Sequence, residues 1–256
     1  MDVSRVLILL GAGVLAGAMN SIAGGGTIVT FPSLIISGLS SIVANATSTI
    51  ALLPGTISSV FGYRRKIPLV RHWLKWFGPV SLVGGLIGGI LLVRTPSAVF
   101  DHLVPFLILF ATVLFMANST VARFFRPGGK EPSRRWLVGA TIFQFGVALY
   151  GGYFGAGIGI LMLASLGMLG FQDVHEMNTV KTILGFLINI VAAIYFVASG
   201  IVDWSSAGTM AVGTIIGGFS GAHFAQKIEQ RMVRRLITAI GLILSALMFY
   251  RTTYTP

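Results

Sequence analysis

The sequence predicts an all-α integral membrane protein that consists of two inverted repeats of about 130 residues. First, 55% of its 256 residues are hydrophobic and only 10% are charged, whereas soluble domains carry about 25% charged residues. Second, long apolar segments alternate with short polar loops along the whole chain. Third, the second half repeats motifs of the first half. We therefore expect a single membrane domain over residues 1–256, with a first repeat at 1–118, a linker loop at 119–135 and a second repeat at 136–256.

Ten apolar segments follow one another, and their lengths separate them into two classes. A helix that crosses the hydrocarbon core needs about 20 residues. Eight segments reach this range, so we predict eight long transmembrane helices. Two segments are too short for a straight crossing, so we predict broken or re-entrant helices there, and whether they cross fully stays open. In chain order the segments are 5–22, 27–39, 44–62, 76–94, 99–117, 136–152, 158–170, 177–198, 205–222 and 233–250, of which 27–39 and 158–170 are the short ones.

Residues 1–18 also have features of a signal peptide, because Arg5 precedes an apolar run and Ala16–Gly17–Ala18 could be a cleavage site. A comparable apolar segment begins the second half, so we expect residues 1–18 to be retained as a membrane helix.

The two halves share motifs as well as hydropathy. If each half has five crossings, the second copy is inverted relative to the first, as in many carriers. The matching pairs are Asn45–Ile50 with Asn178–Ile183, Gly84–Gly89 with Gly213–Gly218, and Leu103–Met116 with Leu236–Phe249.

The distribution of Lys and Arg favours this arrangement. With five crossings per half, only Arg5, Arg94 and Arg251 fall on one side of the membrane and Lys181 lies within a segment. The other cations share the opposite side, and the contrast is weaker if the short segments do not cross. The positive-inside rule then predicts cytoplasmic basic loops and both termini outside. The loop cations are Arg64, Arg65, Lys66, Arg71, Lys75, Arg123, Arg126, Lys130, Arg134, Arg135, Lys227, Arg231, Arg234 and Arg235.

Two glycine clusters interrupt the apolar segments at matching places. They are Asn20–Thr27, which contains Gly24–Gly26, and Tyr150–Gly157. Each glycine weakens a helix by about 1 kcal/mol relative to Ala. Within a bilayer, a helix break persists only where protein or a water-filled cavity satisfies the freed backbone groups. Matching breaks in two halves predict the binding site of a transporter.

Hydroxyl, amide and backbone N–H donors surround these breaks, and helix N-termini attract anions. Any single polar residue could instead cap a helix or bond to a neighbouring helix. Lys181 carries a charge within an apolar segment, which by default marks a functional site, although pairing with Glu176 or snorkelling is an open alternative. Our candidate substrate-binding residues are Asn20, Ser21, Gly24, Gly25, Gly26, Thr27, Asn45, Thr47, Ser48, Tyr153, Gly155, Gly157, Asn178, Lys181 and Thr182.

Several classes of function are disfavoured. The chain has no Cys, and its 4 His are scattered, so we expect no metal site and no cofactor. We find no nucleophile–base pair and expect no enzyme. The net charge of +11 comes from Lys and Arg residues in short loops beside apolar segments. It therefore reflects membrane topology rather than nucleic-acid binding. All 7 acidic residues lie at or near segment ends, which disfavours proton coupling through a buried carboxylate.

Five sequence features occur together in this chain: Asn20–Thr27, Phe31–Pro32, Ala44–Thr49, Gly152–Gly157 and the group Asn178, Lys181 and Thr182. In these features the chain resembles the TauE/SafE sulfite exporter family of membrane permeases. The resemblance implies a multi-pass plasma-membrane carrier for a small sulfur-containing anion such as sulfite, thiosulfate, sulfoacetate or another organosulfonate. We expect alternating access and export, with the anion and the lipid bilayer as partners and a homo-oligomer as an open alternative. An anion channel and a non-transporting membrane scaffold are the rival hypotheses.

Overall fold

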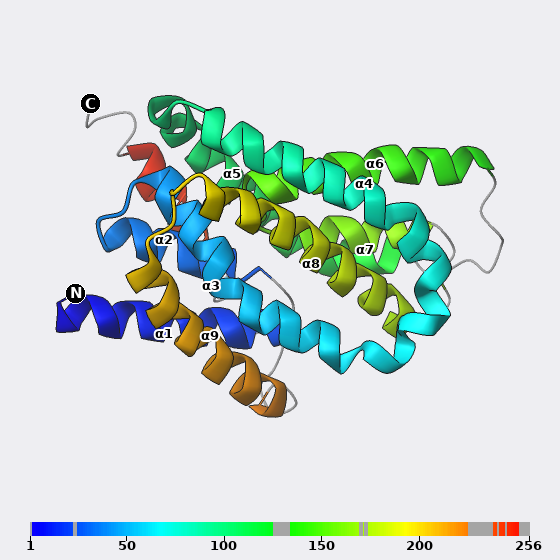
Figure 1. Cartoon of the computed structure of the whole chain (residues 1–256), viewed down its shortest axis with the longest axis horizontal. Helices are drawn as coiled ribbons and strands as arrows, with labels where there is room; N and C mark the ends of the chain where they lie inside the picture. Colours follow the sequence, from blue (N-terminus) through cyan, green and yellow to red (C-terminus); the bar gives the residue numbers. More distant parts are fainter. Residues whose placement is uncertain are drawn as a thin grey trace.

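The computed structural model describes residues 2–22, 25–124, 134–168, 171, 174–224, 238–239, 241–243 and 245–250. Over these ranges every regular element is a helix (Figure 1). The elements are α1 (Val3–Ile22), α2 (Thr27–Ile36), α3 (Ser41–Gly62), the short 3-10 helix η1 (Arg64–Lys66), α4 (Ile67–Arg94), α5 (Ser97–Phe124), α6 (Arg134–Tyr153), α7 (Ile158–Met168), α8 (Val174–Ala198) and α9 (Trp204–Phe224). Of the last predicted segment, 233–250, residues 241–243 and 245–250 are described as helical together with 238–239.

Within the part of the chain that the structure describes, four helical segments are long and apolar enough to cross a membrane. They are Val3–Asn20, Arg64–Arg94, Ser97–Leu114 and Glu176–Ala198. The helices α3 and α9 have 22 and 21 residues, but their many hydroxyl groups and glycines make them less apolar. The all-helical membrane class is therefore confirmed for the described residues, whereas the number of eight long spans stays a prediction.

The two segments predicted to be short are short helices. Helix α2 has 10 residues and α7 has 11, so at about 1.5 Å per residue each covers roughly half of the hydrocarbon core. Each packs against the helices that precede and follow it in the chain: α2 against α1 and α3, and α7 against α6 and α8. Both helices therefore begin within the protein rather than at its surface.

Helices from the two ends of the chain pack together, and glycine makes this possible. Helix α1 lies along α9, and α4 lies between α6 and α8. A side chain at Gly17 would collide with the carbonyl oxygen of Thr214, and one at Gly217 with that of Val14. Close approach of this kind is the usual role of small residues in membrane helix pairs. The described residues 241–243 and 245–250 pack on α5, where Ser245 Oγ donates to the Pro105 carbonyl at 3.0 Å.

Two helices extend further than the hydropathy pattern predicts. Helix α4 begins at Ile67 rather than at residue 76, and α5 continues to Phe124 rather than ending at residue 117. The added turns of α4 contain Arg71 and Lys75, whose side chains are exposed. Lys and Arg are good helix formers, so these polar turns continue the helix although they lower its local hydropathy. The loops are correspondingly shorter than expected.

Candidate functional site

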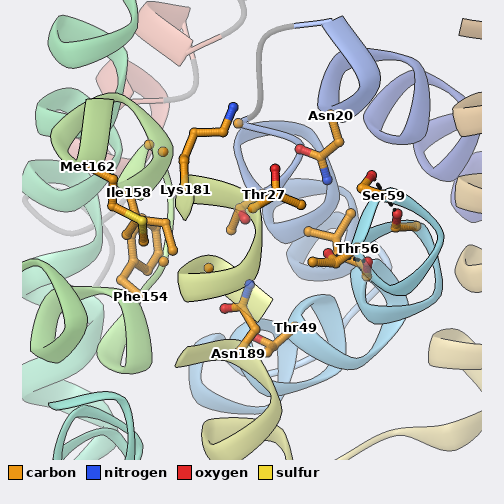
Figure 2. Close-up of a pocket in the computed structure, with 18 residues that line it drawn as sticks. Asn20, Thr27, Thr49, Thr56, Ser59, Phe154, Ile158, Met162, Lys181 and Asn189 are labelled. Carbon is orange, nitrogen blue, oxygen red and sulfur yellow. Dashed lines mark hydrogen bonds between the residues drawn. The ribbon is translucent and has the colours of Figure 1, made fainter. Parts of the chain in front are cut away.

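A cavity of about 150 Å³ lies where the two helix breaks meet α3 and α8. Figure 2 shows side chains from both halves of the chain around it. Each half contributes a break and one long helix, so the site is shared between the halves. The lining residues are Asn20, Gly25, Thr27, Thr49, Leu52, Gly55, Thr56, Ser59, Phe154, Gly155, Gly157, Ile158, Gly159, Met162, Lys181, Thr182, Gly185 and Asn189.

A side chain bridges the break between α1 and α2. Gly25 has φ 95°, a left-handed conformation that residues with a side chain rarely adopt. After this turn, the backbone N–H of Gly26 donates to Asn20 Oδ1 at 2.9 Å. Thr27 then begins α2 at the wall of the cavity. The N-terminus of α2 therefore faces the cavity on a backbone that Asn20 holds in place.

The break between α6 and α7 is built differently. Gly155 and Gly157 both have φ 79°. The backbone N–H of Gly155 donates to the Tyr150 carbonyl at 3.1 Å, and the Tyr150 hydroxyl donates to the Ala156 carbonyl at 2.8 Å. Gly157 and Gly159, at the N-terminus of α7, line the cavity. Two helix N-termini thus meet at one cavity, and both place partial positive charge there.

Lys181 contributes an amine to this site. Its side chain packs over Gly159, where an added Cβ would lie 3.5 Å from Lys181 Cδ. In Figure 2 its amine lies on the side of the cavity where Thr27 and Asn20 lie. Among the described residues, including Glu176, none forms a hydrogen bond or an ion pair with Lys181. The amine is therefore available to a bound anion.

Hydroxyl and amide groups of α3 and α8 complete the wall. Thr49 and Thr56 lie on α3, and their hydroxyls donate to the carbonyls of Asn45 and Leu52 at 3.0 and 3.1 Å. Asn189 of α8 lies beside Thr49 in Figure 2. An amide can donate two hydrogen bonds, so Asn189 adds donor capacity at the end of the cavity that lies away from Asn20.

The cavity brings together seven of the predicted site residues: Asn20, Gly25, Thr27, Gly155, Gly157, Lys181 and Thr182. Gly26 bonds to Asn20 and is not among the lining residues. Gly24 and the side chain of Ser21 lie outside the described residues. Asn178 lies on α8, half-buried, and is not among the lining residues.

The remaining predicted residues are bonded to protein elsewhere. Asn45 Nδ2 donates to the Tyr153 carbonyl at 2.9 Å, and Thr47 Oγ1 accepts from the backbone N–H of Asp203 at 3.0 Å. Ser48 Oγ lies 2.6 Å from Thr30 Oγ1. The bonds of Asn45 and Ser48 are interhelical, the alternative that the sequence left open, and Thr47 bonds to the loop residue that precedes α9.

The other lining residues were not in the predicted set, and among them are Thr49, Thr56, Ser59, Gly159 and Asn189. A signal for three of them exists in the sequence. Thr49, Thr56 and Ser59 follow one another at intervals of seven and three residues, which places them on one face of a helix. Asn189 likewise lies two helical turns after Lys181.

A model of the family described as sulfite exporter TauE/SafE matches residues 9–248. The chain belongs to this family. The match runs from α1 to the helical residues after 238, so it includes every element that lines the cavity. It confirms the resemblance that the glycine clusters suggested, and it makes the chain a member of a family of membrane transporters.

Curated relatives of this TauE/SafE protein carry the same kind of name. A "Probable membrane transporter protein" of Haemophilus influenzae is 26% identical over 98% of this chain and 96% of its own length. "Probable membrane transporter protein YfcA" of Escherichia coli is 27% identical over 95% of this chain and 89% of its own length. "Probable membrane transporter protein YunE" of Bacillus subtilis is 25% identical over 97% of this chain. No solved structure matches the chain.

Proposed function

We propose that this TauE/SafE protein is a secondary carrier that moves a small sulfur-containing anion across the plasma membrane by alternating access. Sulfite, thiosulfate, sulfoacetate and other organosulfonates are the substrate class. The observation that carries the proposal is the convergence of Lys181 and two helix N-termini on one cavity of about 150 Å³. The family description, sulfite exporter, supports the choice of sulfur chemistry.

The charges at the site suit a small oxyanion. Each helix N-terminus is equivalent to roughly half a positive charge, and Lys181 supplies one more. Inside the protein these charges act at a lower effective dielectric than in water. Asn20 and Asn189 at opposite ends of the cavity (Figure 2) provide amide donors for the oxygens of a tetrahedral or pyramidal anion.

The packing of the helices supports two inverted repeats. In the match of Gly84–Gly89 with Gly213–Gly218 between the two halves, Gly88 of α4 corresponds to Gly217 of α9. A side chain at Gly88 would collide with the Leu149 carbonyl of α6, just as one at Gly217 would collide with the Val14 carbonyl of α1. The α4–α6 pair and the α9–α1 pair are therefore equivalent, and each joins one half to the other. An exchange of helices of this kind is expected for two halves related by a pseudo-twofold axis.

The basic end of the molecule sets the proposed orientation. The exposed cations Arg64, Arg65, Arg71 and Lys75 lie together around the α3–α4 connection, and the positive-inside rule places such residues in the cytoplasm, with both termini outside. A cell interior that is negative by 100 mV favours anion exit by about 2.3 kcal/mol per charge. The described residues that line the cavity include no carboxylate. Both observations favour export or facilitated diffusion without a coupled proton.

Reconstitution into liposomes tests this function. We expect saturable efflux of at least one of the four anion types, accelerated by the same anion on the opposite side. A non-saturable flux without counterflow would favour an anion channel instead. Lys181→Met should strongly lower the flux at low anion concentration, and Lys181→Arg should keep more of it. If Lys181→Met folds and transports like the wild type, the proposed site is wrong.

A further inference from the structure

A second cavity, of about 480 Å³, lies beside the first at the end of α3 that leads into η1. Helices α1, α3 and α9 form its walls. The two cavities share Asn20, Leu52, Gly55 and Ser59, so they adjoin at these residues. The other lining residues of the second cavity are Gly17, Pro54, Ser58, Gly62, Tyr63, Thr214, Ile215, Gly218 and Phe219.

The equivalent place in the other half of the molecule is closed. There α8 packs directly on α4: a Cβ at Gly89 would lie 3.3 Å from Ala192 Cα and 3.5 Å from Ala192 Cβ. A Cβ at Gly85 would lie 3.0 Å from Ile188 Cα. Ala192 is 1% exposed, and Ile188 and Phe196 are 0% exposed. The α4–α8 interface therefore leaves no passage at its end of the molecule.

The match of Gly84–Gly89 with Gly213–Gly218 pairs Gly89 with Gly218. The match of Asn45–Ile50 with Asn178–Ile183, continued along the same helices, pairs Ser59 with Ala192. A Cβ at Gly218 would meet only the Gly17 carbonyl oxygen, at 4.0 Å, and Ser59 is exposed. Tyr63, which corresponds to the fully buried Phe196, is only half-buried. The same pair of surfaces is thus in contact in one half and separated in the other.

The separation begins at a defined point of α3. Thr214 Oγ1 donates to the Ala51 carbonyl at 2.9 Å, so α3 and α9 are still in contact at this level. Pro54 and Gly55 follow within the same helix. Proline has no N–H to donate to the carbonyl one turn earlier, and this weakens the helix at that turn. The segment of α3 after Pro54 is therefore able to change its angle while the Thr214 contact is kept.

We propose that the 480 Å³ cavity is the entry vestibule for the anion at the basic end, and that the end of α3 closes it by docking on α9. Ser59 would then meet Gly218 as Ala192 meets Gly89, while α8 separates from α4. The proposal rests on the proposed function, since it gives the carrier its two access states. It assigns the described structure to the state that is open towards the basic loops.

Paired cysteines test the proposal, because the chain has none of its own. In Gly89→Cys/Ala192→Cys the two Cβ atoms start 3.5 Å apart, within the range of a disulfide. This pair should oxidise readily in the described state. Ser59→Cys/Gly218→Cys should oxidise only when the vestibule closes. Free thiols are counted in native membranes by the gel shift that maleimide-polyethylene glycol causes, with Ser59→Cys/Gly218→Ala as the control that cannot cross-link within the chain.

Oxidation of either pair should lower sulfoacetate counterflow at least tenfold, and dithiothreitol should restore it. If the Ser59→Cys/Gly218→Cys pair never oxidises although the protein melts like the wild type, the vestibule does not close and the proposal is overturned. The proposal is also overturned if a variant that carries both cysteine pairs forms both disulfides in one molecule, because α3–α9 and α4–α8 would then be closed at the same time. If the Ser59–Gly218 pair oxidises but the wild type moves no anion, the closure is supported and the proposed function fails.

Discussion

The side chain of Asn20 accepts a hydrogen bond from the backbone of Gly26 across the first glycine break, with 2.9 Å between Oδ1 and N. One residue therefore both stabilises the turn and lines the cavity. These two roles require different atoms, because Oδ1 faces the backbone and Nδ2 is left for the cavity. They are separable by substitution.

Asn20→Asp and Asn20→Ala should differ in their effect on stability and have the same effect on transport. Asn20→Ala leaves the Gly26 N–H without its acceptor, which costs about 1–3 kcal/mol, so its melting temperature should fall. Asn20→Asp keeps an acceptor and should melt close to the wild type. Both should lose anion flux, because both lack the Nδ2 donor and Asp in addition brings a negative charge to an anion site. An Asn20→Asp variant with normal flux would show that Nδ2 takes no part in binding.

Lys181→Met should separate binding from folding. The loss of a charged hydrogen-bond partner costs about 1.5–3 kcal/mol of binding, so the apparent affinity for the anion should fall by about tenfold to 100-fold. Because an unpaired cation inside a membrane segment is costly, the variant should melt at the same temperature as the wild type or higher. Flux as a function of anion concentration, together with thermal melting in detergent, measures both. A large drop in melting temperature would instead indicate a structural role for Lys181.

Gly17 and Gly11 of α1 form a matched pair for the helix contact with α9. A Cβ at Gly17 would collide with the Thr214 carbonyl, whereas nothing lies within 4 Å of a Cβ at Gly11. Gly17→Ala should destabilise the protein by about 1–3 kcal/mol through overpacking. Gly11→Ala should be neutral or stabilising by up to about 1 kcal/mol, because alanine favours the helix. Equal melting temperatures for the two variants would contradict the close packing of α1 on α9.

Much of the fold was predictable because its signals are local. The short helices α2 and α7 follow from segment length, and the breaks at Gly25 and Gly155 follow from glycine content. The orientation of α3 was not predictable. Thr47 and Thr49 are two residues apart and therefore face different sides of the helix. Only the packing of α3 between α8 and α9 decides that Thr49 faces the cavity while Thr47 bonds to Asp203.

Ligand-dependent melting of the purified protein tests the central claim most directly. Sulfite, thiosulfate, sulfate, sulfoacetate, taurine and chloride are compared for the wild type and for Lys181→Met. A ligand present at 100 times its dissociation constant stabilises the folded protein by about 2.7 kcal/mol. We predict such a shift for at least one sulfur-containing anion, its absence with chloride, and its loss in Lys181→Met. No shift with any of these anions, or an equal shift in Lys181→Met, would contradict an anion site at this cavity.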